Sequence, residues 1–311
     1  MNLPKKVVLC EVGPRDGLQN ESRILGVEEK VKLINLITES GFKVIEVGSF
    51  MHPKAVPQMA STDEVFKRIN KKDGVEYRAL IANMKGLERA VDCGCRKVKL
   101  NVSASKSHNL ANLNRTPEES VAGFKDTVQA AVSSNIEISG SISMPFGSPW
   151  EHEIPVDDVK KIVQSYIDAG ITEISLSDAS GMAVPNQVYS MCTEMQRIFP
   201  QVKWILHFHN TRGLGVANIV AGMQAGITWF DTSFAGVGGC PFVPGAAGNV
   251  STEDVIHMLD EMNIETGIEL DKTIEISKML VSMLDHSTDS YILRAGKSKD
   301  LILELPTGQK K

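Results

Sequence analysis

The stretch GVEEKVKLINLITESGFKVIEVGS (26–49) contains one complete copy of the pattern that decides the fold. In its first part, 26–41, apolar residues recur three and four positions apart, which predicts an amphipathic helix, and Gly41 is suited to ending that helix. Its second part, 43–49, is a short β-rich run and is predicted to be a strand. A helix that leads directly into a strand is the unit of an α/β protein with a parallel sheet.

The same unit recurs along the whole chain. Helical segments such as 116–134 and 156–170 separate the β-rich runs, and Gly170 and Gly226 repeat the position of Gly41, just before a strand. Eight units at intervals of about 30 residues fit an α/β (β/α)8 barrel, or TIM barrel, better than a doubly wound sheet with its usual five or six strands. The predicted strands are KVVLCEV (6–12), KVIEVGS (43–49), YRALIA (77–82), KVKLNVS (97–103), EISGSIS (137–143), EISLSDA (173–179), VKWILHFH (202–209) and TWFDTSF (228–234).

We expect a single catalytic domain over 1–311. The barrel should occupy about 6–262, and an extra helical segment over about 263–300 should follow it and include DKTIEISKMLVSMLD (271–285). No linker rich in Pro, Gly or Ser interrupts the alternation of strands and helices. A chain of 311 residues, of which 42% are hydrophobic, can bury the core of such a barrel.

Composition and charge favour a small-molecule substrate. The net charge of −5 comes from 38 acidic and 33 basic residues spread without long runs, which argues against a nucleic-acid or polybasic membrane partner. The apolar run before Glu11 is too short for a signal peptide or a membrane span, so a cytoplasmic location is predicted. An odd, scattered set of cysteines indicates reduced thiols: Cys10, Cys93, Cys95, Cys192 and Cys240. Cys93 and Cys95 are interpreted as structural.

The sharpest candidate site is His207-Phe208-His209 at the end of the seventh predicted strand. Side chains at positions i and i+2 of a strand point to one face, so both imidazoles can reach one ion. In a TIM barrel the carboxyl ends of the strands form the mouth of the active site. Two imidazoles with oxygen donors suit Mg²⁺ or Mn²⁺. The alternative is a pair of histidines that are simply hydrogen-bonded within a polar barrel mouth.

Two charged residues follow the first predicted strand. Asp16 supplies an oxygen donor, and Arg15 supplies a permanent cation. Asp16 is the favoured oxygen ligand, although the PRDG sequence around it is also typical of a turn. Arg15 beside a metal ligand could stabilise an enolate oxygen, or it could form a salt bridge to Glu46. Both roles are compatible.

The loop GVGGCPFVPGAAGN (236–249) follows the eighth predicted strand. Its five glycines fit neither a Walker nor a dinucleotide fingerprint, but they permit a lid that closes over substrate. Cys240 within it is either an incidental thiol or a reactive group that acts when the lid is shut.

Taken together, these motifs resemble the 3-hydroxy-3-methylglutaryl-CoA lyase family, from about residue 7 to about residue 285. The glycine-rich cysteine loop is the most specific of them, because related metal-dependent barrel enzymes usually lack it. The motifs are EVGPRDGLQNE (11–21), IEVGSF with PKAVPQMA (45–60), EISLSDASG (173–181), HFHNTRG (207–213) and GVGGCPFVPGAAGN (236–249).

The resemblance implies divalent-metal-dependent cleavage of (S)-3-hydroxy-3-methylglutaryl-CoA to acetyl-CoA and acetoacetate, in leucine degradation or ketone-body-type metabolism. It implies an acyl-CoA partner and a homodimer. At matching positions it implies that the metal ligands are Asp16, His207, His209 and Asn249.

The resemblance also assigns catalytic roles. Arg15 is implied to contact substrate and stabilise the enolate, Glu46 and Asp178 to be active-site carboxylates, and Cys240 to be required for turnover. Either Asp16 or His207 could be the general base. Ser49 and Ser175, polar residues of the second and sixth predicted strands, are assigned to substrate binding with Arg15.

Two other classes of function are compatible with parts of this pattern. A Claisen-condensing acyltransferase or an aldol-type lyase would use a similar barrel and metal, although the condensing enzymes usually carry further C-terminal domains. A catalytically silent metal-binding or acyl-CoA-binding barrel would keep the fold without the reaction.

Overall fold

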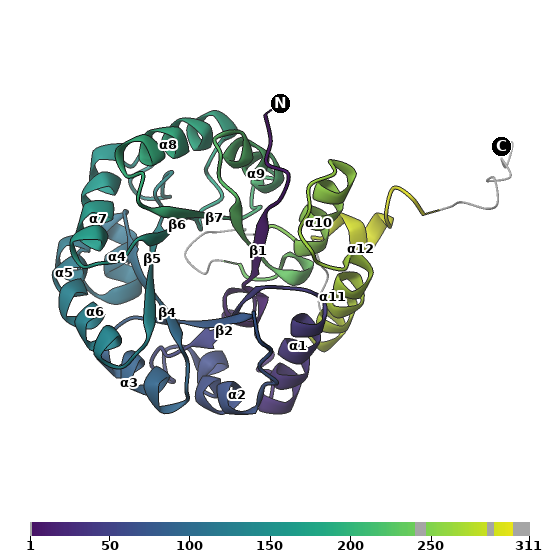
Figure 1. The fold of residues 1–311 in the computed structure, drawn as a ribbon, viewed down its shortest axis with the longest axis horizontal. Helices are drawn as coiled ribbons and strands as arrows, with labels where there is room; N and C mark the ends of the chain where they lie inside the picture. Colours follow the sequence, from purple (N-terminus) through teal and green to yellow (C-terminus); the bar gives the residue numbers. More distant parts are fainter. Residues whose placement is uncertain (1, 240–246, 285–288, 301–311) are drawn as a thin grey trace, which may run out of the picture.

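The computed structural model describes residues 2–239, 247–284 and 289–300. Eight parallel strands form a closed barrel in which each strand pairs with its sequence neighbours and β8 pairs with β1, as Figure 1 shows. This architecture confirms the predicted TIM barrel. The strands are β1 Val8–Glu11, β2 Val44–Ser49, β3 Glu76–Ile81, β4 Lys97–Ser103, β5 Glu137–Ser143, β6 Glu173–Asp178, β7 Lys203–Phe208 and β8 Trp229–Thr232.

Helices surround the barrel (Figure 1), and three short helical turns, η1 Gly13–Gly17, η2 Pro57–Met59 and η3 Phe234–Gly236, lie in the loops. Within the described residues the helices are α1 Val27–Glu39, α2 Thr62–Arg68, α3 Met84–Asp92, α4 Lys106–Leu113, α5 Pro117–Ala122, α6 Phe124–Ser133, α7 Val156–Asp168, α8 Pro185–Ile198, α9 Gly215–Gln224, α10 Thr252–Glu261, α11 Leu270–Leu284 and α12 Tyr291–Ala295.

One predicted helix is divided. The segment 116–134 was expected to be continuous, but α5 ends and α6 begins at Gly123. Glycine disfavours a helix interior because it loses the most backbone freedom on folding. Thr116 caps the first part, since its hydroxyl accepts a hydrogen bond from the backbone N–H of Glu119.

The helix-ending role of the repeated glycines is confirmed. Gly41, Gly170 and Gly226 have φ angles of +106°, +96° and +94°, which a residue with a side chain rarely adopts. Each one ends a turn between a helix and the next strand, so the repeat identified in the sequence is also a repeat of backbone conformation.

The main hydrophobic core lies between the barrel and its helices, whereas the barrel interior is unusually charged. The interior apolar cluster of Cys10, Val12 and Val44 is small, and the strands add buried Arg78 and Lys99. TIM-barrel interiors are more often filled by Val, Ile and Leu. Ion pairs must therefore satisfy much of the inside of this barrel.

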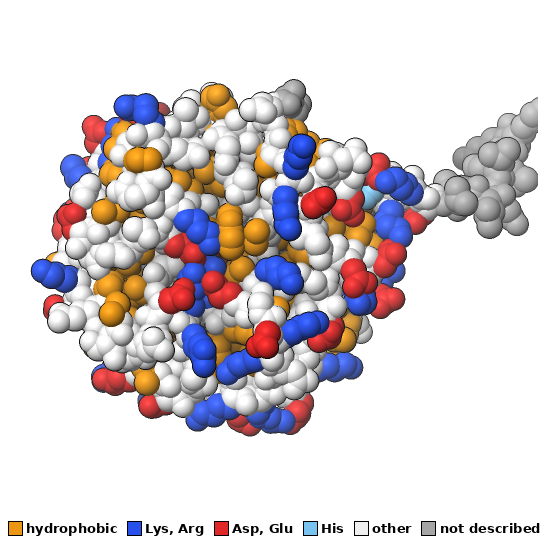
Figure 2. Space-filling view, viewed as in Figure 1, with side chains coloured by type: hydrophobic (Ala, Val, Ile, Leu, Met, Phe, Trp, Pro, Cys, Tyr) orange, Lys and Arg blue, Asp and Glu red, His pale blue; other side chains and the backbone are white. Residues whose placement is uncertain are grey.

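The chain after β8 forms the predicted C-terminal helical segment. Helix α11 packs against α1 and α10, and the Ser277 hydroxyl donates a 2.8 Å hydrogen bond to Glu253 of α10. None of the helices that the structure describes is both long and apolar enough to cross a lipid bilayer. On the face drawn in Figure 2, basic and acidic side chains are interspersed and do not form a field of one sign.

Four of the cysteines lie in the described part of the chain, and all four are buried, unpaired thiols: Cys10, Cys93, Cys95 and Cys192. Burial raises the pKa of Cys95 to about 12 and also raises that of Cys93. Thiols with raised pKa values are weak nucleophiles and weak metal ligands, which supports their interpretation as structural.

Candidate metal centre

The turn after β1 brings two functional side chains to the barrel mouth. The Val12 carbonyl accepts hydrogen bonds from the backbone N–H groups of Arg15 (3.0 Å), Asp16 (2.7 Å) and Gly17 (3.3 Å), which closes the π-helical turn η1. A Cβ at Gly17 would lie 2.7 Å from the Ser233 hydroxyl and 2.8 Å from a Val237 methyl group, so any larger residue would require these side chains to shift.

Asp16, His207 and His209 form one cluster whose candidate ligand atoms lie within 4.8 Å of one another. The Nε2 atoms of both histidines are 3.7 Å from Asp16 Oδ2. Burial alone would raise the pKa of Asp16, but Arg15, followed by the two histidines, holds that pKa well below its usual range. An ionised carboxylate and two imidazoles that converge in this way fit a divalent metal ion.

Asn249, the fourth predicted metal ligand, lies beside this cluster. Its backbone forms an antiparallel bridge with His209, and its side-chain amide donates hydrogen bonds to Asp16 Oδ2 (2.9 Å) and to the Val237 carbonyl (3.0 Å). The described part of the glycine-rich loop is held against the same turn, since a Cβ at Gly238 would lie only 2.9 Å from the Asp16 carbonyl. The loop ends are therefore part of the site.

A chain of buried charges runs behind the cluster. Arg15 donates through Nη1 to Asp16 at 2.5 Å and through Nε to Glu46. The other oxygen of Glu46 lies 2.7 Å from Lys99 Nζ, which lies 3.3 Å from Asp231 Oδ2. Burial by itself would raise the pKa of Glu46, but Arg15 and Lys99 lower it. Glu46 therefore stays ionised and contacts Arg15 from behind.

Lys99 and Asp231 were not among the predicted site residues. Asp231 Oδ2 lies 3.4 Å from His207 Nδ1, so the chain of charges returns to the metal cluster from its other side. A signal was present in the sequence: Lys99 alternates with other polar residues in KVKLNVS (97–103), which places them on one face of β4.

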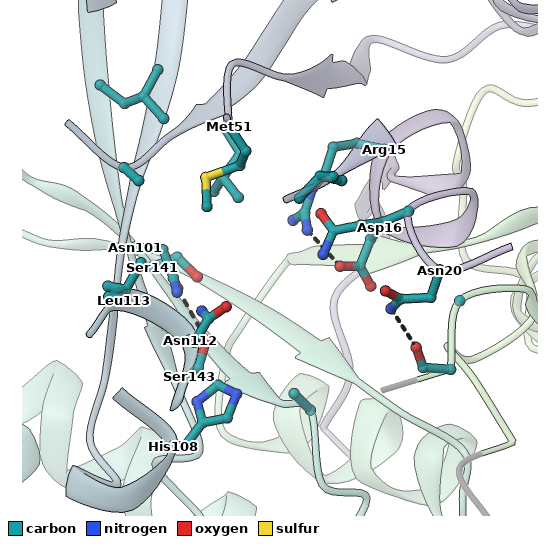
Figure 3. A pocket seen from close by; sticks show the side chains of 18 of the residues that line it. Arg15, Asp16, Asn20, Met51, Asn101, His108, Asn112, Leu113, Ser141 and Ser143 are labelled. Atoms are coloured by element: carbon teal, nitrogen blue, oxygen red, sulfur yellow. Dashed lines mark hydrogen bonds and ion pairs between the residues drawn. The ribbon is translucent and has the colours of Figure 1, made fainter. Parts of the chain in front are cut away.

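A pocket opens in front of the cluster, shown in Figure 3. Arg15, Asp16 and Asn20 lie on one side of it, and the ends of β4 and β5 with helix α4 form the other. The opposite wall is polar, and the Ser143 hydroxyl lies 3.0 Å from Asn101 Oδ1. The labelled residues of that wall are Asn101, His108, Asn112, Leu113, Ser141 and Ser143.

Asp178, Ser49 and Ser175, all predicted site residues, do not line this pocket. The carboxylate of Asp178 accepts hydrogen bonds from the Ser180 hydroxyl (2.8 Å) and from two backbone N–H groups of its own loop, which indicates that it organises that loop. Ser49 and Ser175 are buried and do not line the pocket, and their hydroxyls have no hydrogen-bond partner among the described residues. Cys240 lies outside the described residues.

A TIM barrel with two histidines and an aspartate converging at its mouth defines a metal-dependent barrel enzyme. The HMGL-like family matches residues 6–280, and this chain belongs to that family. The chain is 39% identical over 298 residues to hydroxymethylglutaryl-CoA lyase YngG of Bacillus subtilis, covering 96% of this chain and 100% of the relative. These matches bear out the predicted family and the predicted enzyme class.

Two further proteins show the same likeness along nearly the whole chain. The mitochondrial hydroxymethylglutaryl-CoA lyase of Homo sapiens is 39% identical, with 94% of this chain and 90% of the human protein covered. A solved HMG-CoA lyase of Acinetobacter baumannii, in complex with coenzyme A and 3-methylmalate, superposes with a TM-score of 0.93 at 40% identity, covering 98% and 100% of the two chains.

Proposed function

We propose that this chain cleaves (S)-3-hydroxy-3-methylglutaryl-CoA to acetyl-CoA and acetoacetate. The observation that carries the proposal is the convergence of Asp16, His207 and His209 beside Arg15 at the mouth of a pocket. The near-complete coverage of hydroxymethylglutaryl-CoA lyases supports it. The coenzyme A in the solved relative supports an acyl-CoA substrate here.

The proposed metal ligands are Asp16, His207, His209 and Asn249, and Mg²⁺ or Mn²⁺ suits this donor set. When bound, the cation supplies a Lewis acid that lowers the pKa of the substrate hydroxyl. Asp16 and His207 are the two candidate bases for the hydroxyl proton, because both side chains lie at the cluster.

Removal of that proton lets the hydroxyl carbon become the ketone of acetoacetate. The bond between this carbon and the CH₂ next to the thioester breaks, and its electron pair forms the enolate of acetyl-CoA. Arg15 is proposed to hold the enolate oxygen. Two of its nitrogens bond to Glu46 and Asp16, whereas its Nη2 has no hydrogen-bond partner among the described residues and the side chain lines the pocket.

The remaining predicted residues take supporting roles in this proposal. Glu46 positions Arg15, since it contacts the guanidinium from behind. Asp178 positions the loop after β6 through its backbone contacts. Cys240 is proposed to protonate the enolate carbon when the loop closes. The assignment of Ser49 and Ser175 to substrate binding stays a prediction, and both hydroxyls are buried outside the pocket lining.

The homodimer and the cytoplasmic location stay predictions, as does the single catalytic domain. Sedimentation analysis of the purified protein would test the homodimer. Limited proteolysis would test the single domain, because a second domain would be released at a linker.

Product identification tests the proposed reaction. The purified chain should be incubated with Mg²⁺ or Mn²⁺ and a panel of 3-hydroxy-3-methylacyl-CoA substrates, and acetoacetate should appear together with acetyl-CoA. A Claisen-condensing acyltransferase would instead consume acetyl-CoA and a keto acid, and an aldol-type lyase would release other carbonyl products. A silent binding barrel would bind acyl-CoA without turnover. Condensation alone, release of other carbonyl products, or acyl-CoA binding without turnover would each contradict the proposal.

A further inference from the structure

Lys99 is a buried ammonium group between two carboxylates that belong to different sides of the candidate metal centre. Its side chain is only 2% exposed, and its Nζ lies 2.7 Å from Glu46 and 3.3 Å from Asp231. Glu46 contacts Arg15, and Asp231 contacts His207. Lys99 itself does not line the pocket.

The contact between Asp231 and His207 determines how the histidine faces the cluster. Asp231 Oδ2 lies 3.4 Å from Nδ1 of the ring, while Nε2 of the same ring lies 3.7 Å from Asp16. A carboxylate behind Nδ1 favours a proton on that nitrogen and leaves the lone pair of Nε2 available for a metal. The position of Asp231 is therefore important for metal binding.

We propose that Lys99 is a positioning residue for the metal centre, because its ammonium group fixes Asp231 behind His207 and Glu46 behind Arg15. The proposal rests on the proposed function only in assuming that the cluster binds a divalent metal. It goes beyond that function by assigning a role to a residue two contacts away from the cluster.

The charge balance explains why a cation is needed at this point. Without Lys99, two fully buried carboxylates would face the space that it vacates, and such groups are costly unless paired. Asp231 and Glu46 would then repel each other across that space, and Asp231 would no longer be held behind His207.

The direction of the change in metal affinity separates a positioning role of Lys99 from a simple electrostatic effect of its charge. If Lys99 acted only through its positive charge, its removal would strengthen the binding of a divalent cation, because like charges repel. A positioning role predicts the opposite, a weaker metal affinity. Loss of an outer-shell partner of a metal-binding histidine typically costs about 10-fold to 100-fold in affinity.

The test measures Mn²⁺ binding to the resting enzyme by electron paramagnetic resonance, with no substrate present. Lys99→Met should weaken Mn²⁺ binding by about tenfold, the lower end of the range for an outer-shell partner. The matched control is Lys97→Met. Lys97 lies two residues earlier on the same face of β4 and also pairs with carboxylates, those of Glu76, Glu137 and Glu173, which are not in the metal cluster. The control should bind Mn²⁺ normally.

A double-mutant cycle with Asp231→Asn tests whether Lys99 acts through Asp231. The combined variant should weaken Mn²⁺ binding no more than Asp231→Asn alone, because the two changes remove one interaction. Lys99→Arg, which keeps the charge, should restore part of the affinity. If Lys99→Met does not fold, Lys99→Gln serves instead. Tighter or unchanged Mn²⁺ binding, an equal loss in the Lys97→Met control, or fully additive effects would each overturn the proposal.

Discussion

Replacing Arg15 by lysine separates stabilisation of the enolate from simple binding. The guanidinium donates through Nε to Glu46 and through Nη1 to Asp16, and the Arg15 side chain lines the pocket. A lysine keeps the positive charge, but its single nitrogen cannot satisfy two carboxylates and also reach the substrate. We therefore expect Arg15→Lys to retain metal binding and most acyl-CoA binding while losing turnover.

The size of the loss follows from the chemistry of comparable sites. Removing one preorganised donor at a developing oxyanion costs about 3–4 kcal/mol, or about 10²–10³ in kcat. Steady-state kinetics with metal titration should show kcat reduced at least about a hundredfold with little change in KM, since lost ground-state binding would affect KM alone.

A matched arginine provides the control for this substitution. Arg89 also donates through Nε and Nη2 to a carboxylate, that of Asp63, but it does not line the pocket. Arg89→Lys should keep kcat normal. A near-normal kcat for Arg15→Lys would refute the assignment and reduce Arg15 to a brace between Glu46 and Asp16.

Three further substitutions test other parts of the site. His209→Ala should weaken the affinity for the activating metal by one or more orders of magnitude, and an unchanged metal titration of the folded variant would remove this histidine from the site. Cys240→Ser should change the free energy of unfolding by less than about 1 kcal/mol yet abolish most activity, and a fully active variant would show that the thiol is incidental. Burial raises the pKa of Glu11 to about 8 from its ordinary 4.5, despite hydrogen bonds from Thr252 and two backbone N–H groups. Between pH 4.5 and about pH 8, Glu11 is therefore protonated in the folded state and ionised in the unfolded state. The free energy of unfolding should fall as the pH rises through this range. Glu11→Gln should flatten that part of the profile in denaturant titrations, whereas an unchanged slope would assign it to other groups.

The barrel and the metal cluster were predictable because each depends on local periodicity. Gly41 and its repeats mark the helix ends, and the i, i+2 spacing of His207 and His209 directs both rings toward Asp16. The break at Gly123 was missed because the apolar pattern continues across it, so the pattern alone did not distinguish one helix from two.

The charged contacts behind the cluster depend on information that local patterns do not contain. Glu46, Lys99 and Asp231 come from β2, β4 and β8, which are not neighbours in the sheet. Side chains from alternate strands meet in layers inside a TIM barrel, so these three residues can touch only after the barrel closes. Strand periodicity places Lys99 on the same face of β4 as Asn101 and Ser103, but the closed barrel was needed to identify its partners.

The backbone bridge between His209 and Asn249 fixes the point at which the chain returns to the barrel after β8. At the outgoing end, Gly238 lies so close to Gly17 that a Cβ there would be 2.8 Å from the Gly17 Cα. The two ends therefore resemble the framework positions that hold a variable loop in an antibody.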